Sequence, residues 1–183
     1  MVETVTEKQI YTYEDYLKTP DDKRYELIEG ELLMTPSPFP EHQRISRKIE
    51  SIIEKFISEK NLGEVFDAPC DVYLDDRNVV QPDLFFISKQ RAKIVEEKHI
   101  KGAPDLVIEI ISESSVYRDM IQKKKLYAKF GVKEYWIVIP KENLIEVYVL
   151  KEKKFNLFKT YSGNETLHSP SLKGFKMPLK AIF

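Results

Sequence analysis

The sequence predicts an α/β protein in which one mixed β-sheet is flanked by helices. The predicted elements run helix, three strands, helix, strand, an order typical of an α/β sandwich and not of a doubly wound fold. The chain contains no internal repeats and no Gly-rich phosphate loop, so a Rossmann-type or P-loop nucleotide-binding protein is excluded. Predicted β-hairpins at the N-terminal and C-terminal ends extend this core.

The first long helix is predicted from periodicity. Between residues 41 and 59, isoleucine and phenylalanine side chains recur at the i, i+4, i+7 and i+8 steps of an amphipathic helix, and Gly63 is predicted to mark its end. The segment before it, residues 35–40, holds three prolines, which fix φ and remove backbone donors. That segment is therefore predicted to be neither helix nor central strand.

The other elements follow from alternation, apolar runs and turn residues. A short helix is predicted at 13–17 and a second long helix at 117–130, which stops at Gly131. The predicted strands are 25–29, 31–34, 65–74, 79–87, 106–111 and 135–139, with a hairpin at 144–150 and 155–161 and a short exposed helix within 88–98.

Composition limits the function classes. The chain has 183 residues, with 29 Lys and Arg against 30 Asp and Glu, and a formal net charge of -1. This balance excludes a bulk polycation that binds nucleic acid by charge alone, but not an enzyme with a local basic patch. The single cysteine, Cys70, excludes an intramolecular disulfide framework and a multi-cysteine zinc site.

The N-terminal residues carry charges and lack the apolar run of a signal peptide, and no run approaches the ~20 residues that span a bilayer. We therefore expect a cytoplasmic protein without membrane contact, folded as a single domain over residues 1–183.

Two carboxylates interrupt strands that are otherwise apolar. Glu109 stands within the Leu, Val and Ile run of 106–111, and Asp83 interrupts 79–87. A buried carboxylate is costly unless it is paired, protonated or bound to a cation. Asp83 at an edge strand and Glu109 paired with a Lys or Arg would be a purely structural explanation. Two carboxylates on adjacent strands can also converge on one divalent cation, which their joint occurrence favours.

The second long helix adds a lysine in an apolar stripe. At ~100° per residue, Lys123 lies about 20° from Phe130 and about 40° from Tyr127 on a helical wheel. Either its stem packs while the ammonium reaches the surface, or the ammonium meets an anionic partner such as Glu109 or Asp83. Asp119, one turn earlier, is placed to pair with Lys123 or Arg118.

These residues resemble the Pro-Asp…(Asp/Glu)-x-Lys signature of the restriction-endonuclease-like nuclease superfamily. Pro82-Asp83 and Glu109 match it, but position 111 is Ile where the signature has Lys; Lys123 is placed to supply that lysine from the following helix. More specifically, the chain is similar to the Uma2 family, on segments that run in order over nearly its whole length. The matching segments are 25–32, the Pro-rich link before His42, 81–84, 104–112, Arg118-Asp119, Lys123, Tyr127 and 131–138.

The resemblance implies a restriction-endonuclease-like fold, a Mg²⁺ or Mn²⁺ site and DNA as substrate. Asp83 and Glu109 would hold the metal, and Lys123 would align the attacking water and stabilise developing charge. Glu29 would complete the metal's outer shell, although a surface turn explains it equally well. His42 could touch a phosphate or assist metal binding, but a capping or exposed histidine is the simpler interpretation.

DNA contact would use Arg44, Arg47 and Lys48 on the first long helix or 123–125 on the second. Two further functions stay open. One is a non-catalytic interaction or dimerisation module that keeps the fold, for instance as a homodimer. The other is a metal-dependent hydrolase of a small phosphoester or nucleotide that shares the site and differs only in cleft width.

Overall fold

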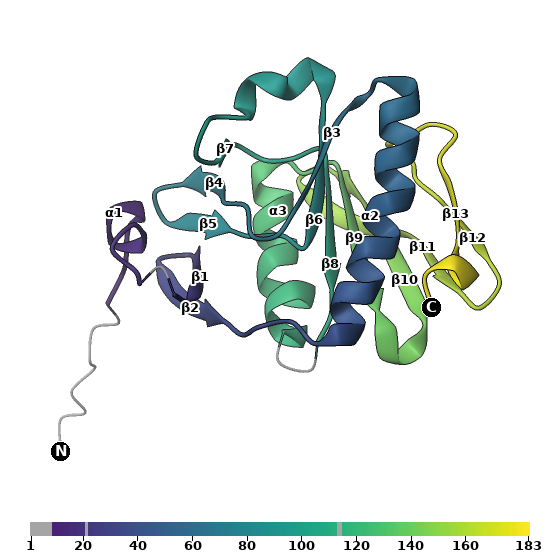
Figure 1. The fold of residues 1–183 in the computed structure, drawn as a ribbon. Helices are drawn as coiled ribbons and strands as arrows, with labels where there is room; N and C mark the ends of the chain where they lie inside the picture. Colours follow the sequence, from purple (N-terminus) through teal and green to yellow (C-terminus); the bar gives the residue numbers. More distant parts are fainter. Residues whose placement is uncertain (1–8, 21, 113–114) are drawn as a thin grey trace.

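The computed structural model describes residues 9–20, 22–112 and 115–183 (Figure 1). In that part of the chain, a five-stranded and a six-stranded sheet are accompanied by helices and a small two-stranded sheet. The helical elements are α1 (Tyr13–Tyr16), α2 (Pro40–Lys60), η1 (Lys89–Ile94), η2 (Arg118–Lys123), α3 (Lys124–Phe130), η3 (Pro140–Glu142) and η4 (Leu179–Ala181). The strands are β1 (Arg24–Ile28), β2 (Glu31–Thr35), β3 (Gly63–Asp67), β4 (Val72–Asp75), β5 (Asn78–Val80), β6 (Leu84–Ser88), β7 (Ile100–Lys101), β8 (Leu106–Ile110), β9 (Glu134–Ile139), β10 (Leu144–Lys151), β11 (Lys154–Ser162), β12 (Thr166–His168) and β13 (Lys176–Pro178).

The six-stranded sheet is the centre of the fold. Its strand order is β11-β10-β9-β8-β6-β3, in which β8 and β9 are parallel and the other pairs antiparallel. Helix α2 covers one face, and η2 with α3 covers the other (Figure 1). The predicted mixed sheet with flanking helices is confirmed.

Strand β8 is buried on both faces, because its side chains alternate between the two layers. Ile108 and Ile110 pack in the core beneath α2, whereas Val107 packs in the core beneath α3. By this alternation Glu109 points toward α3, where its side chain is 2% exposed. The orientation of one strand therefore delivers a carboxylate to the inner surface of a helix.

Helix α2 forms where the isoleucine periodicity predicted it. Pro40 occupies its first turn, where a missing N–H costs nothing. The predicted end at Gly63 was wrong by two residues: the helix is closed by Asn61 in the left-handed conformation, whose N–H bonds the carbonyls of Ile57 and Ser58. Gly63 instead begins β3.

Two long predicted strands are each divided in the structure. The run 65–74 forms β3 and β4, separated at Pro69, and the run 79–87 forms β5 and β6, separated at Pro82. Proline has no N–H for a ladder, so it interrupts each strand. The chain then passes from one sheet to the other, and Asp83 lies at the crossing between the five-stranded and six-stranded sheets.

The predicted helix 117–130 is not uniform. Residues Arg118–Lys123 form a π-helix, and only Lys124–Phe130 is α-helical before Gly131 closes it at φ +86°. π-Helical turns are rare and concentrate at functional sites. This one carries Asp119 and Lys123, whose polar atoms lie 3.6 Å apart.

The predicted N-terminal and C-terminal hairpins are present as β1–β2 and β10–β11. Glu29 and Gly30 form the β1–β2 turn with φ of 51° and 80°, the sign that a two-residue type I′ turn requires at both positions. Within the described ranges, no helix is both long enough and apolar enough to span a membrane.

Candidate active site

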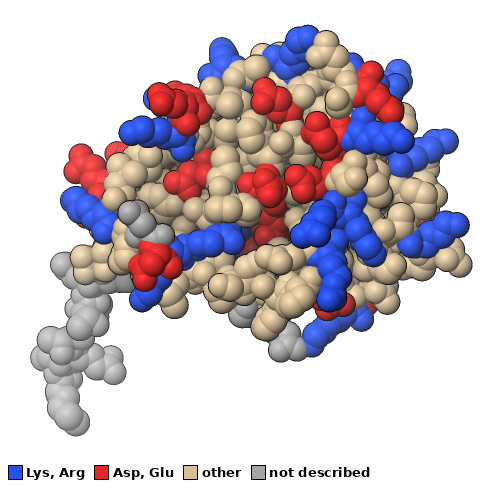
Figure 2. Space-filling view, viewed as in Figure 1, with Lys and Arg blue, Asp and Glu red and all other residues tan. Residues whose placement is uncertain are grey.

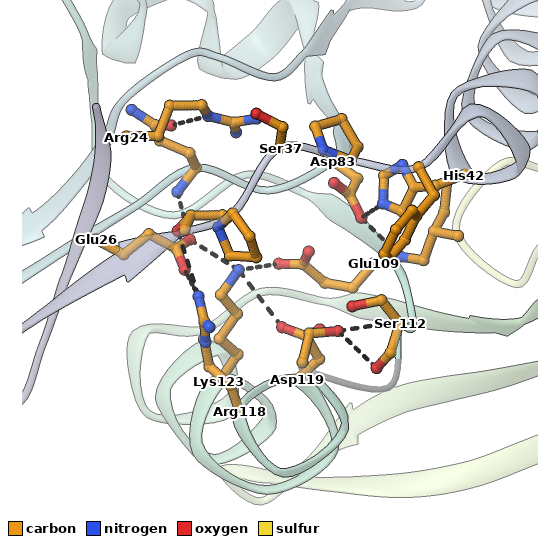
Figure 3. Close-up of a pocket in the computed structure, with 17 residues that line it drawn as sticks. Arg24, Glu26, Ser37, His42, Asp83, Glu109, Ser112, Arg118, Asp119 and Lys123 are labelled. Atoms are coloured by element: carbon orange, nitrogen blue, oxygen red, sulfur yellow. Dashed lines mark hydrogen bonds and ion pairs between the residues drawn. The ribbon is translucent and has the colours of Figure 1, made fainter. Parts of the chain in front are cut away.

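A cavity of about 330 Å³ opens where the two sheets meet, lined by residues of β1, the Pro-rich link, α2, β8 and η2. In the space-filling view, acidic side chains gather near the centre of the visible face, and Lys and Arg side chains border them on two sides (Figure 2). Inside the cavity, Asp83, Glu109 and Lys123 point into the same space (Figure 3). Asp83 directly precedes β6, Glu109 lies on β8 and Lys123 lies on η2.

Lys123 is the buried cation of this site. Its ammonium lies 2.8 Å from Glu26 Oε1, 2.9 Å from Glu109 Oε1 and 3.6 Å from Asp119 Oδ1. Burial by itself lowers the pKa of Lys123, but the three carboxylates outweigh burial and raise this pKa well above its usual value. Lys123 is therefore a permanently charged donor.

Glu109 accepts two hydrogen bonds on one oxygen. Lys123 Nζ donates to Oε1 over 2.9 Å and the Tyr127 hydroxyl over 2.7 Å. Burial raises the pKa of Glu109 well above its usual value. Lys123 acts in the opposite direction, and the nearby carboxylates of Asp119, Asp83 and Glu26 add to the raising effect of burial. The structure pairs Glu109 with a lysine, as the structural explanation expected, and it places Glu109 and Asp83 in the lining of one cavity. Asp83 does not belong to an edge strand, because β6 has a paired strand on each side.

Asp83 is held from both sides. Its Oδ2 accepts the backbone N–H of Ile110 at 2.8 Å and lies 3.0 Å from His42 Nε2. The antiparallel register of β6 and β8 pairs Leu84 with Ile108, which places Asp83 beside Glu109. Among the described residues, neither Asp83 Oδ1 nor Glu109 Oε2 has a hydrogen-bond or ion-pair partner (Figure 3).

Glu26 is a site residue that the sequence reasoning missed. Its side chain is 2% exposed, and it accepts from Gln81 N at 2.8 Å and from Arg118 at 3.3 Å in addition to Lys123. The criterion that selected Asp83 and Glu109, a carboxylate within an apolar strand, applies equally to Glu26 in Tyr-Glu-Leu-Ile. That signal was present and could have found it.

Glu29, the predicted outer-shell ligand, is not brought into the site. It is exposed at the tip of the β1–β2 turn and does not line the cavity. Its backbone N–H instead bonds Asn78 Oδ1 at 2.9 Å, which fixes the turn. Two other predicted residues do lie at the site: His42 lines the cavity beside Asp83, and Asp119 is buried in it.

The predicted basic contacts are only partly exposed. Arg44, Arg47 and Lys48 lie on the outer surface of α2. Lys123 is buried, and Lys124 lies over the ring of Tyr148 with its ammonium 3.3 Å from the ring centre, so neither is a free surface cation.

The charge balance of the cavity tests whether a divalent cation fits. Among the described residues, four carboxylates line the cavity, those of Glu26, Asp83, Glu109 and Asp119, against three cations, Arg24, Arg118 and Lys123. A divalent cation at the open oxygens of Asp83 and Glu109 would offset this excess. Among the described residues no cluster of three or more His, Cys, Asp or Glu is arranged to hold a metal. Two carboxylates suffice for Mg²⁺, which keeps several waters and is held by one or two carboxylates plus substrate phosphate. The residues fit such an ion.

The profile of the Uma2 family, described as "Putative restriction endonuclease", matches residues 12–180. The chain belongs to the Uma2 family. A solved structure similar to this Uma2 protein is described as "a putative nuclease belonging to DUF820" from Anabaena variabilis ATCC 29413. The two are 22% identical, with a TM-score of 0.78 over 94% of this chain and 97% of the other, which establishes a shared fold. A search of the curated proteins found no match.

This Uma2 protein departs from the nuclease signature at Ile111. The structure places Ile111 against the core beneath α3, while Lys123 reaches Glu109 from the π-helix. The lysine of the site is thus supplied by η2 and not by β8.

Proposed function

We propose that this Uma2 protein is a Mg²⁺- or Mn²⁺-dependent nuclease that hydrolyses phosphodiester bonds of DNA. The observation that carries the proposal is the convergence of Asp83, Glu109 and Lys123 on one cavity from three separate elements (Figure 3). Two carboxylates and a charged lysine match the needs of a phosphoryl centre, where anionic oxygens must be neutralised as water attacks.

Asp83 and Glu109 would hold the metal through Oδ1 and Oε2. When bound, the metal polarises a phosphoryl oxygen and generates hydroxide near neutral pH. The protein contributes orientation: the Ile110 N–H and His42 fix Asp83 Oδ2, and Tyr127 with Lys123 fixes Glu109 Oε1. Both carboxylates therefore present one oxygen to the cavity without having to reorganise.

Lys123 would act as a donor to the water or to a phosphate oxygen. Two of its three N–H groups are directed at Glu26 and Glu109, and Asp119 at 3.6 Å lies outside hydrogen-bond distance for the third. With its pKa raised, the ammonium cannot accept the proton of the attacking water. Its contribution is electrostatic stabilisation of the developing negative charge.

DNA would approach over the face on which α2 presents Arg44 and Arg47, both exposed. Basic side chains border the acidic centre in Figure 2 and would bind the flanking phosphates. A bound metal would offset the negative charge of the carboxylates in the cavity. Because few cations take part, binding to non-specific DNA is expected to be weak and sensitive to salt.

The test compares the parent protein with Asp83→Asn and with Glu29→Gln as the matched control, on supercoiled and single-stranded DNA with Mg²⁺ or Mn²⁺. We expect cleavage by the parent and by Glu29→Gln, loss of cleavage in Asp83→Asn, and loss of Mg²⁺ binding by calorimetry in the same variant. Cleavage that survives Asp83→Asn would refute the metal site. Absence of both cleavage and metal binding in the parent would favour a non-catalytic interaction module.

A further inference from the structure

We propose that an apolar groove beside the catalytic cavity binds one unpaired nucleobase of the substrate, so that the preferred substrate is single-stranded or locally unpaired nucleic acid. This inference rests on the nuclease function proposed above and specifies its substrate class. It concerns a groove between the start of α2, the start of the π-helical segment and the end of β9.

The groove has a volume of about 500 Å³. Its apolar lining is made by Phe39, Ile111, Val116, Met120, Ile139 and Pro140. It shares Phe39, His42 and Ser112 with the catalytic cavity, so the two spaces adjoin. A phosphodiester bound at Asp83 and Glu109 would therefore have an adjacent nucleotide within reach of the groove.

The charges at the groove favour a base over a phosphate. Among the described residues, Glu41 and Glu142 line the groove against one lysine, Lys141. Two carboxylates disfavour a phosphate group, whereas a nucleobase is uncharged and presents an apolar face with polar edges. The sugar-phosphate backbone is thus expected to stay in the catalytic cavity while a base turns into the groove.

Phe39 is the stacking platform in this arrangement. Its side chain is 69% exposed at the junction of the two spaces, and it forms no aromatic pair with another described residue. Pro38 and Pro40 restrict the backbone on either side, and Phe39 is the N-cap of α2 with φ of −72° and ψ of 157°. An exposed ring on a rigid backbone is preorganised for a base, because little conformational entropy is lost on stacking.

A base can enter the groove only when it is unpaired. Within a duplex its face is covered by stacked neighbours and its edge is engaged by the opposite strand, so extrusion costs a few kcal/mol. Single strands, ends and bubbles avoid that cost. The groove therefore predicts a preference among DNA structures and little preference among sequences.

The experiment measures binding separately from cleavage. Fluorescence anisotropy with Ca²⁺ in place of Mg²⁺ compares a single-stranded oligonucleotide, the blunt duplex and the same duplex with a central unpaired bubble, and a 2-aminopurine-labelled strand reports stacking. The variants are Phe39→Ala, Phe39→Trp and the matched control Phe158→Ala, whose ring is 54% exposed on the remote strand β11. Thermal melting confirms that each variant is folded.

We expect the single strand and the bubble to bind more tightly than the duplex. Phe39→Ala should lose roughly tenfold in affinity for them and should lose 2-aminopurine quenching. Phe39→Trp should retain both, and Phe158→Ala should match the parent.

Equal binding of all three DNAs, no binding of any, or identical behaviour of Phe39→Ala and Phe158→Ala would overturn the inference. The inference would also be overturned if Phe39→Ala changed self-association but not DNA binding, because the groove would then be a protein interface. Binding through Phe39 without cleavage in Mg²⁺ would refute the proposed nuclease function and leave the base site standing. Duplex cleavage that is unchanged in Phe39→Ala would refute the base site and leave the nuclease function standing.

Discussion

Lys123 Nζ lies 2.8 Å from Glu26 Oε1, so the ammonium of the π-helix is held as closely by the N-terminal hairpin as by the central sheet. Glu26 also accepts from Arg118 and from the backbone N–H of Gln81. One carboxylate on β1 therefore connects the five-stranded sheet to the helix that carries Lys123. The position of that lysine depends on both sheets.

Replacing Glu26 with Gln should separate this role from that of an ordinary surface glutamate. The neutral amide removes a charge facing Lys123 and Arg118, and we expect a loss of about 1–3 kcal/mol in unfolding free energy. Cleavage should fall by at least about tenfold because Lys123 is less firmly placed. Glu29→Gln, at the exposed turn of the same hairpin, should change stability by less than about 0.5 kcal/mol. Equal effects of the two substitutions in urea titrations and cleavage assays would contradict the assignment.

Replacing Lys123 with Met should be costly in a way that depends on pH. The change leaves Glu26, Glu109 and Asp119 buried without their ammonium, and breaking such a buried pair costs about 3–5 kcal/mol near neutral pH. The loss should shrink in acid as the carboxylates become protonated, and cleavage should disappear. Chemical denaturation at pH 5 and pH 8, with exposed Lys125→Met as the control, measures the difference. A pH-independent loss equal to that of the control would argue against the buried ion cluster.

His42 should tune metal affinity through Asp83. Its Nε2 lies 3.0 Å from Asp83 Oδ2, and outer-shell partners of this kind are worth about 10–100-fold in metal affinity. We expect His42→Ala to raise the Kd for Mg²⁺ by that factor in calorimetry, while the neighbouring exposed residue, changed as Gln43→Ala, leaves it unaltered. An unchanged Kd in His42→Ala would show that the Ile110 N–H alone positions Asp83.

Glu134 provides a pH-dependent test of the fold away from the site. It is fully buried and accepts from Trp136 Nε1, Ser169 Oγ and the Ser171 N–H. Burial raises the pKa of Glu134 above its ordinary value of 4.5, against the lowering effect of those hydrogen bonds. The folded state therefore binds the proton more tightly than the unfolded state.

The stabilisation linked to Glu134 is full below about pH 4.5 and is lost as pH rises through the folded-state pKa. Relative to Glu134→Gln, which does not titrate, the parent should lose unfolding free energy as pH increases above that value. Urea titrations of both proteins across this range provide the measurement. A constant difference between parent and variant would show that the pKa of Glu134 is not raised by folding.

Much of the framework was predictable because it rests on local patterns. The isoleucine period defined α2, and the apolar runs around Glu109 and Asp83 placed these residues on neighbouring strands. The wheel placed Lys123 in the apolar stripe of its helix, and the structure buries it there. Local patterns did not predict that the strands 65–74 and 79–87 are each divided. Pro69 and Pro82 stand in the sequence at the points of division, but the two parts of each divided strand join different sheets. That choice of sheet depends on pairing with distant segments.

The apolar run around Glu26 could have marked this residue as a candidate, but its partner could not be predicted from local patterns. Strand β1 is buried on both faces, with Leu27 and Ile28 in separate core clusters, so alternation does not identify an inward position. The sequence by itself determined the mixed α/β class, the carboxylates of Asp83 and Glu109 and the buried lysine. Only the tertiary structure decided which glutamate meets that lysine. Ion-pair geometry is set by the register and packing of segments far apart in the chain, and side-chain periodicity carries no information about either.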